Sequence, residues 1–192
     1  MLIAVISRIP ELYANRRLQA AARERGADVH MIDPLAPFKQ GVAESLDAVI
    51  PRFGPIWQSQ GGAVLAQMQA CGAICLNTPE AVALARDKPA ALQVFAGLQL
   101  PMPSSIPGTA VRDASALAQL PFPFPMLIKE DASAGGWGIH RVEDAAAALA
   151  VIARLNSAGA RFTLQTFIAE SAGRDLRVFV GGGQILAAMC RT

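Results

Sequence analysis

The first half of the chain alternates short apolar runs with helical segments. Leu2 to Ser7 is a continuous apolar run, which is typical of a strand covered on both faces. Pro10 fits a helix start, and the helix it opens runs to a glycine stop at Gly26. The same pattern predicts strands at 27–33, 46–54 and 73–77, a helix at 59–72, and helical structure over 78–97 that breaks near Lys88 and Pro89. Strand and helix alternating at this spacing indicate a doubly wound parallel sheet over residues 1–85.

The second half follows a different pattern. Two proline-rich segments, 100–108 and 120–125, are incompatible with a helix interior or a central strand, and they bracket a short helix at 111–120. Strands at 126–131, 138–142 and 161–168 and an alanine-rich helix at 143–156 then predict a separate α+β subdomain from about residue 100 to residue 168. A final hairpin turns at Gly181 to Gly183 and starts an antiparallel sheet within 169–192. The predicted fold class is α/β, built from these three parts.

Composition restricts the class of protein further. A hydrophobic content of 53% indicates a folded chain, and a formal charge of +2 gives no electrostatic footprint for nucleic acid. Apolar runs fall well short of the roughly 20 residues of a membrane helix. The N-terminus starts with a strand and lacks the basic segment of a secretory signal, so we expect a cytoplasmic protein without a membrane partner. Cys71, Cys75 and Cys190 fit no zinc spacing and are expected to be buried thiols, so no metal ligand is assigned.

Candidate chemistry lies between the strands at 126–131 and 138–142. Lys129 leads into a segment that contains Gly135, Gly136 and Gly138. Bare backbone N–H groups in such a loop can close over phosphate oxygens, and a lysine can supply a point charge. No P-loop or G-x-G-x-x-G signature accompanies it. On these residues alone, an ordinary hairpin tip with a solvated lysine is the simpler interpretation.

Four segments in order change that interpretation. These are "NTPEAVALARDKPAAL", "PMLIKEDASAGGWGI", "LQTFI" and "GRDLRVFVGGGQILAA". Together with "RRLQAAARERGADVHMIDP" and "DAVIPRFG" near the N-terminus, the series resembles the ATP-grasp superfamily, most closely its RimK-like branch of carboxylate–amine ligases. The resemblance covers essentially the whole chain. It implies a pre-ATP-grasp, substrate-side domain at 1–85, a linker helix and lid subdomain at 86–168, and the first strands of a C-terminal subdomain at 169–192.

The resemblance also implies roles for individual residues. Lys88 and Lys129 match the phosphate-side lysines, and Gly135, Gly136 and Gly138 match the lid glycines. The hinge that reads adenine matches Gln165, Thr166, Phe167 and Ile168, although the family usually has an acid where this chain has Thr166. Asp175 matches a ribose-binding acid. Arg177 and Arg191 match arginines that face the reacting acyl phosphate, for which a planar guanidinium is suited.

The implied reaction is ATP-dependent joining of a carboxylate to an amine through an acyl phosphate. The implied substrate class is glutamate added to a protein tail or to a pterin-type cofactor. ATP and Mg²⁺ are the implied cofactors, with the magnesium ligands expected beyond residue 192, which would make the chain truncated. Two alternatives stay open: a catalytically incomplete module for nucleotide binding or protein interaction, and a purely structural α/β domain. Exposed final strands also favour edge pairing into a homo-oligomer.

Overall fold

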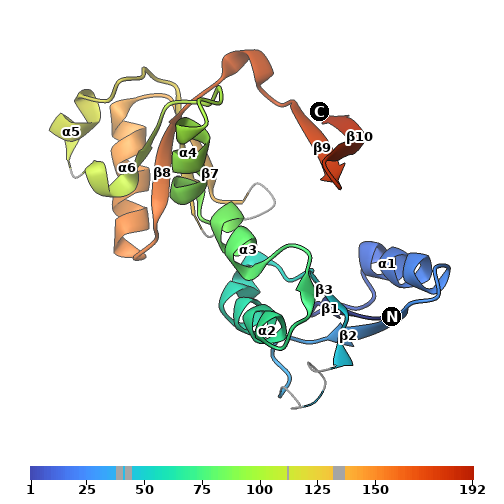
Figure 1. Cartoon of the computed structure of the whole chain (residues 1–192). Helices are drawn as coiled ribbons and strands as arrows, with labels where there is room; N and C mark the ends of the chain where they lie inside the picture. The colour runs from blue at the N-terminus through green and yellow to red at the C-terminus, as the bar shows by residue number, and fades with distance from the viewer. Residues whose placement is uncertain (38–40, 42–44, 112, 132–136) are drawn as a thin grey trace. The chain divides into compact units, whose positions relative to one another are not determined.

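The fold was analysed in a computed structural model of the chain, which describes residues 1–37, 41, 45–111, 113–131 and 137–192 (Figure 1). The chain forms two compact units. The first comprises Met1–Leu100 together with Asp131–Trp137, and the second comprises Pro101–Glu130 together with Gly138–Thr192.

A four-stranded parallel sheet organises the first unit. Its strands are β1 (Leu2–Ile6), β2 (Asp28–Ile32), β3 (Ala48–Pro51) and β4 (Ile74–Cys75), in the order β2-β1-β3-β4. The central strand β1 pairs in parallel with both β2 and β3. The parallel sheet predicted from the alternation of apolar runs and helices is therefore confirmed.

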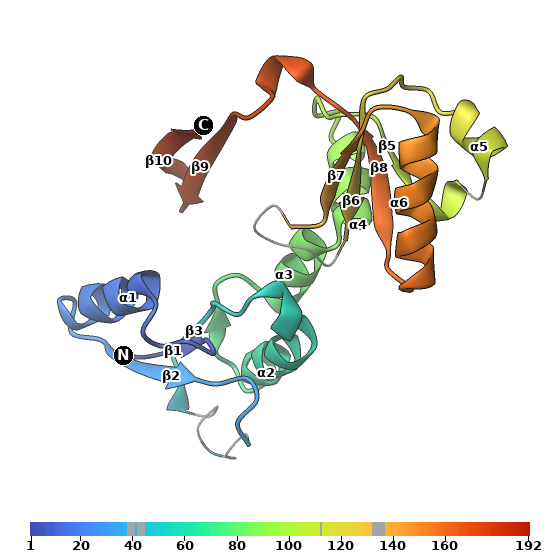
Figure 2. The ribbon, with the colours of Figure 1, turned by 180° about the vertical axis from the view of Figure 1, so that it is seen from behind.

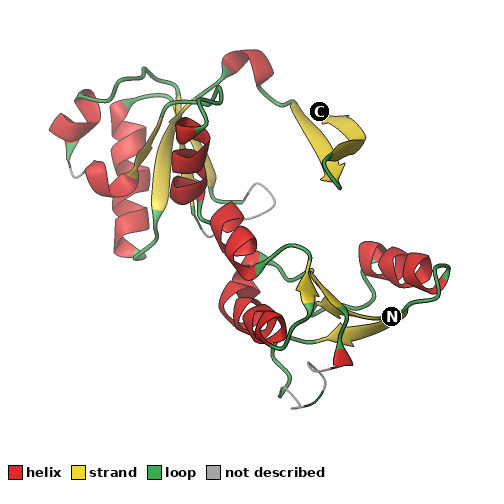
Figure 3. Cartoon of the chain, viewed as in Figure 1, coloured by secondary structure: helices red, strands yellow, loops and turns green. Residues whose placement is uncertain are grey.

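Helices cover both faces of this sheet. Figures 1 and 3 show α1 (Tyr13–Arg23) on one face and α2 (Gln58–Ala70), which follows the 3-10 turn η2 (Pro55–Trp57), on the other. Because side chains alternate along a strand, one face of β1 and β3 packs on α2. The buried residues of that core include Ala4, Ile6, Val49, Phe53, Leu65 and Met68.

Hydrogen bonds made by nearby residues set the start of two helices, α4 (Lys88–Gly97) and α1. The predicted break near Lys88 is present, since α3 (Pro79–Arg86) ends and α4 begins on either side of Asp87. Asp87 is extended and its carboxylate accepts a hydrogen bond from the Ala90 N–H at 3.0 Å, which caps α4. By contrast, α1 begins at Tyr13, later than Pro10 predicts, because residues 9–12 form a turn closed by Leu12 N–H to Ile9 O.

The second unit contains an antiparallel sheet. Its strands are β5 (Ser105–Pro107), β6 (Met126–Glu130), β7 (Ile139–Val142) and β8 (Phe162–Thr166), in the order β5-β8-β6-β7. The short β5 lies in a segment in which the sequence predicts no central strand. It occupies an edge of the sheet, where a proline costs no ladder hydrogen bond.

Helices α5 (Ala114–Ala118) and α6 (Ala145–Ser157) pack against one face of this sheet, and η3 (Gly108–Ala110) follows β5. Figure 2 shows α6 running along that face. The fully buried Ile128 and Leu164 point toward it. Strand alternation therefore places Leu127, Lys129 and Gln165 on the opposite face.

The final hairpin forms a sheet of its own. After η4 (Ala169–Ser171), β9 (Asp175–Gly181) and β10 (Gln184–Arg191) pair antiparallel, and the turn uses Gly182 and Gly183 at φ of +58° and +76°. Positive φ favours glycine, so the predicted turn is confirmed. Large apolar side chains on both strands are exposed, among them Leu176, Phe179, Ile185 and Leu186.

One expectation about the cysteines is wrong. Cys71 and Cys190 are exposed, and only Cys75 is partly buried. Cys71 follows the last turn of α2 and Cys190 lies on the exposed hairpin, so neither reaches a core. Burial raises the pKa of the Cys75 thiol, with a smaller contribution from the charge of Glu80.

Candidate functional site

A chain of hydrogen bonds crosses the face of the antiparallel sheet that lies opposite α6. Lys129 on β6 donates from Nζ to Gln165 Oε1 on β8 at 2.5 Å. Gln165 Nε2 donates to Ser105 Oγ on the edge strand β5 at 2.8 Å, and Ser105 Oγ donates to the Pro103 carbonyl at 3.0 Å. Three strands thus hold one polar row in place.

The register of the sheet explains this contact. Lys129 pairs with Thr163, and Leu127 pairs with Gln165, so Lys129 and Gln165 are diagonal neighbours on one face. Gln165 is only 8% exposed, so its amide is fixed by partners on both sides. Two of the predicted site residues, one phosphate-side lysine and one hinge residue, therefore lie in contact. Ser105 was not predicted, because it lies in a proline-rich segment with no motif.

The remaining hinge residues lie at and beyond the end of β8. Thr166 is the last residue of the strand, and its backbone N–H donates to Ser104 O at 3.0 Å. Phe167 follows the strand, and the Arg141 guanidinium of β7 stacks on its ring with 4.5 Å to the centroid. Ile168 is 39% exposed. Because the Thr166 N–H is already engaged, any backbone group of the predicted hinge that contacts an adenine ring has to lie after Thr166. Arg141 is a second residue that the sequence did not single out.

Lys88 lies in the first unit, at the first position of α4. Its ammonium group donates to the backbone carbonyl of Asp131 at 2.7 Å. Asp131 opens the glycine segment, so this lysine contacts the segment's first residue. A lysine at the first turn of a helix also adds its charge to the positive end of the helix dipole.

The glycine segment is described only at its ends. Gly135 and Gly136 lie outside the described residues. Gly138 has φ of +76°, and its carbonyl accepts a hydrogen bond from the Glu130 N–H at 2.8 Å, where β6 ends. An L-residue with a Cβ would be strained at this φ, so glycine is required where the chain returns to β7.

The predicted acyl-phosphate residues lie on the C-terminal hairpin. Asp175 on β9 is directly opposite Arg191 on β10. Arg191 Nε donates to Asp175 Oδ1 at 2.7 Å, and its Nη2 also binds Asp175 Oδ2, so the pair is bidentate. Arg177 lies two residues after Asp175 on the same face of β9. An open pocket is lined by Gly173, Arg174, Asp175, Arg191 and Thr192.

This pairing changes the electrostatics of Asp175. The hydrogen bond from Arg191 is the main cause that lowers the pKa of the Asp175 carboxyl; desolvation opposes it, and the charges of Arg191 and Arg177 each lower the pKa by less. The same contact raises the pKa of Arg191. Both groups are therefore charged at neutral pH.

The described part of the chain has neither a cluster of metal ligands nor a membrane-spanning helix. It contains no group of three or more His, Cys, Asp and Glu side chains placed to hold a metal ion. Its helices include none that is long and apolar enough to cross a membrane.

Comparisons with known proteins decide the family. The profile of the RimK-like ATP-grasp domain matches residues 85–192, and that of the RimK PreATP-grasp domain matches residues 1–37. A probable alpha-L-glutamate ligase of Xanthomonas oryzae pv. oryzae is 36% identical over the whole of this chain and 69% of its own length. The chain belongs to the RimK-like ATP-grasp family.

Other relatives of this RimK-like chain agree. A probable alpha-L-glutamate ligase of Stenotrophomonas maltophilia is 35% identical over the whole chain and 70% of its own length. Among solved structures, a RimK-domain ATP-grasp protein of Sphaerobacter thermophilus has a TM-score of 0.77 at 19% identity, covering 98% of this chain and 72% of its own. A D-cycloserine synthetase has a TM-score of 0.74 at 20% identity, covering 98% and 67%. These likenesses confirm the ATP-grasp fold.

Proposed function

We propose that this RimK-like chain binds the polyphosphate of ATP on the face of its antiparallel sheet opposite α6, as the nucleotide-holding part of a carboxylate–amine ligase. The observation that supports it is the Lys129–Gln165–Ser105 row, which holds an ammonium group on the sheet face opposite α6. Phosphate oxygens can replace the Gln165 oxygen at Nζ, because an ammonium group binds a charged oxygen more strongly than a neutral amide oxygen. Lys88 is proposed as the second phosphate-side lysine, with Gly135, Gly136 and Gly138 as lid glycines.

The proposed reaction forms an amide in two steps. A substrate carboxylate attacks the γ-phosphoryl group to give an acyl phosphate and ADP, and an amine then attacks the carbonyl carbon and releases phosphate. In this proposal Arg177 and Arg191 face the acyl phosphate, where guanidinium groups match the geometry of phosphate oxygens. Asp175 orients Arg191 through the bidentate contact. Magnesium would supply charge neutralisation between the phosphates. The described residues contain no cluster of side chains that could hold this ion.

The proposed acid substrate is glutamate, because relatives at 35% to 36% identity are named probable alpha-L-glutamate ligases. A protein tail or a pterin-type cofactor is the proposed acceptor. The division into a substrate-side domain at 1–85, a lid subdomain at 86–168 and the start of a C-terminal subdomain at 169–192 is part of the same proposal.

Isothermal titration of the chain with ADP and with Mg-ATP tests nucleotide binding. We expect measurable heat of binding, and a substantially lower affinity in Lys129→Ala. Absence of heat at millimolar nucleotide would contradict the proposal. An unchanged dissociation constant in Lys129→Ala would remove Lys129 from the site.

Nucleotide binding without turnover is the second candidate. It is favoured by two carboxylates that already have basic partners and so are less available to a metal ion: Asp175 binds Arg191, and Glu130 Oε1 lies 3.0 Å from His140 Nε2. An ADP-release assay with glutamate and Mg-ATP separates the two candidates. Turnover by the chain supports the complete ligase, whereas nucleotide binding with no ADP release supports the incomplete module.

A further inference from the structure

Arg141 joins the outer strand β7 to the end of β8, across the strand between them. The order β5-β8-β6-β7 places β6 between β8 and β7. Arg141 is directly opposite Leu127 on β6, and Leu127 is directly opposite Gln165 on β8, so the three side chains share the sheet face opposite α6. The Arg141 guanidinium lies over the Phe167 ring, 4.5 Å from its centroid. It thus reaches the first residue after β8.

A carboxylate also binds this guanidinium. Arg141 Nε donates to Glu143 Oε1 at 2.8 Å. Arginine suits such a double contact, because its planar group has N–H donors at its edge and a flat face that stacks on an aromatic ring. Each contact is weak on a protein surface, but both act on one rigid group. The position of the Phe167 ring is therefore tied to β7 and to the first residue after it.

The backbone beside the Phe167 ring has polar groups that a ligand can use. Thr166 ends β8, and its N–H donates to Ser104 O at 3.0 Å. In the described part of the chain, neither the N–H nor the C=O of Phe167 takes part in a backbone hydrogen bond, and nor does the N–H of Ile168. A few backbone donors and acceptors beside an apolar wall orient a small ligand in its site. A nucleotide base, which is flat and has donors and acceptors along one edge, fits this segment.

The same sheet face carries the proposed phosphate contact. Lys129 is a diagonal neighbour of Arg141 on β7 and of Gln165 on β8. It lies opposite Thr163, near the start of β8, whereas Phe167 follows the end of that strand. The two contacts are therefore separated along the strand direction, as the polyphosphate and the base are separated in a nucleotide.

We propose that Arg141 is a positioning residue for the nucleotide base. It acts through Phe167, because the guanidinium holds the ring and the ring fixes the backbone of Phe167 and Ile168, on which the base docks. The inference rests on the proposed nucleotide function and adds which end of the ligand this residue serves. The competing role for Arg141 is a direct contact with phosphate, since it is a second cation on the face that carries Lys129.

Isothermal titration of the full chain with ADP and with inorganic tripolyphosphate separates these roles. Arg141→Ala should weaken ADP binding by about threefold to tenfold, the effect of losing one cation–π contact, and leave tripolyphosphate binding unchanged. Lys129→Ala should weaken both probes. Arg141→Lys keeps a cation for the ring and should recover part of the ADP affinity. A loss in Arg141→Ala that is equal for the two probes would identify a phosphate contact and overturn the positioning role.

A double-mutant cycle on ADP affinity tests whether Arg141 acts through the ring. Phe167→Leu removes the ring and keeps an apolar side chain. If Arg141 acts through Phe167, Arg141→Ala has little further effect on ADP binding in the Phe167→Leu background. Losses that multiply in the double variant would overturn the inference. The cycle uses ADP alone, so it decides the matter whatever the affinity for tripolyphosphate.

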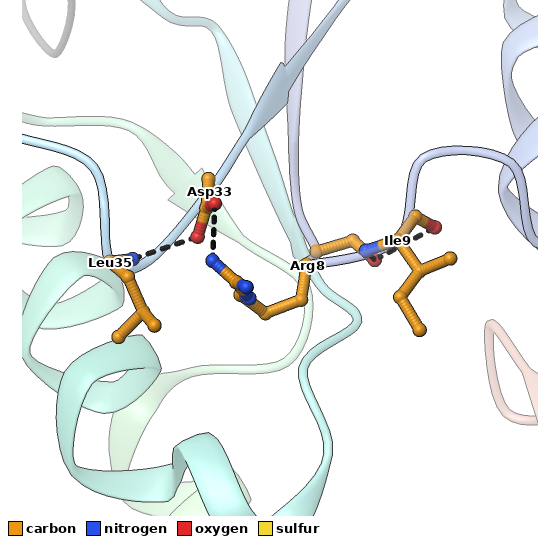
Figure 4. Close-up of polar contacts among 5 residues, drawn as sticks. Arg8, Ile9, Asp33 and Leu35 are labelled. Carbon is orange, nitrogen blue, oxygen red and sulfur yellow. Dashed lines mark hydrogen bonds and ion pairs between the residues drawn. The ribbon is translucent and has the colours of Figure 1, made fainter.

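Arg8→Ala is the matched control, because Arg8 makes the same two kinds of contact in the first unit. Figure 4 shows Arg8 donating from Nη1 to Asp33 Oδ2 at 2.7 Å, and the guanidinium lies 5.2 Å from the centroid of the Trp57 ring. We expect Arg8→Ala to leave ADP affinity unchanged. Equal losses of ADP affinity in Arg8→Ala and Arg141→Ala would overturn the inference.

The outcomes for this inference and for the proposed function differ. A chain that binds ADP with the same affinity before and after Arg141→Ala loses this inference alone. A chain that binds neither probe loses the proposed function, and this inference with it. Circular dichroism checks the fold of each variant, so that a loss of affinity is not a loss of structure.

Discussion

Arg191 binds both carboxylate oxygens of Asp175 across the β9–β10 hairpin. The two residues are direct cross-strand partners, although they are far apart in the sequence. The resemblance to the family assigned Asp175 to ribose and Arg191 to the acyl phosphate. Both assignments stay predictions, and the pairing adds that Asp175 fixes the orientation of the Arg191 guanidinium.

The first prediction concerns pH. Because Arg191 lowers the pKa of Asp175 from its ordinary value of 3.8, the pair stabilises the hairpin above that ordinary value. This contribution is lost as the pH falls through the lowered pKa of the folded state. Titration of the Asp175 carboxyl carbon by NMR should show the lowered pKa, and Arg191→Ala should return it toward 3.8.

Arg177→Ala is the comparison for this titration. Arg177 acts on Asp175 through charge alone, without a hydrogen bond, so its removal should raise the pKa of Asp175 less than Arg191→Ala does. An equal shift in both variants would show that the bidentate contact does not set the Asp175 pKa.

The second prediction concerns the polar row on the sheet. Gln165→Ala removes the hydrogen bonds to Lys129 and Ser105 and leaves a gap at a position that is 8% exposed. We expect the free energy of unfolding to fall by about 1–3 kcal/mol, measured by urea denaturation. Ser105→Ala removes the two contacts of Ser105 Oγ, with Gln165 Nε2 and with Pro103 O, but keeps the bond between Lys129 and Gln165, and it should cost about 0.5–1.5 kcal/mol. A larger loss in Ser105→Ala than in Gln165→Ala would contradict this order.

The third prediction concerns nucleotide affinity. Lys129→Ala should raise the dissociation constant for ADP by about tenfold or more, since it removes a charged hydrogen-bond donor to phosphate. Lys129→Arg keeps the charge and should lose less. Arg25→Ala, which removes an exposed charge just after α1, should leave the constant unchanged; an equal loss in Arg25→Ala would indicate a general charge effect.

The fourth prediction uses two adjacent glycines of α2. A Cβ at Gly61 would lie 2.4 Å from the Phe53 ring, whereas a Cβ at Gly62 would meet only Gln58 at 4.0 Å. Gly61→Ala should lower the free energy of unfolding by about 1–3 kcal/mol through overpacking. Gly62→Ala should raise it by about 0.5–1 kcal/mol, because alanine has the higher helix propensity. Thermal unfolding of the two variants measures both signs.

Much of the fold follows from local signals in the sequence. Continuous apolar runs predicted the parallel strands, and Gly182 and Gly183 fixed the turn of the hairpin through their positive φ. Local signals failed where tertiary contacts dominate. Pro10 does not start α1, because Asn15 binds Ser7 and Ile9 and holds the preceding residues in a turn. The edge strand β5 forms from a proline-rich segment only because β8 provides a partner.

The sequence by itself determined which residues carry charge, where most of the strands and helices lie, and the family to which the chain belongs. Only the tertiary structure decided which side chains meet. Lys129 reaches Gln165 because the register of β6 and β8 makes them diagonal neighbours, and Arg191 reaches Asp175 because the hairpin places them opposite each other. Such pairings depend on the register between strands: the alternation of apolar and polar residues fixes the face on which a side chain lies, but a shift by two residues keeps that face and changes the partner.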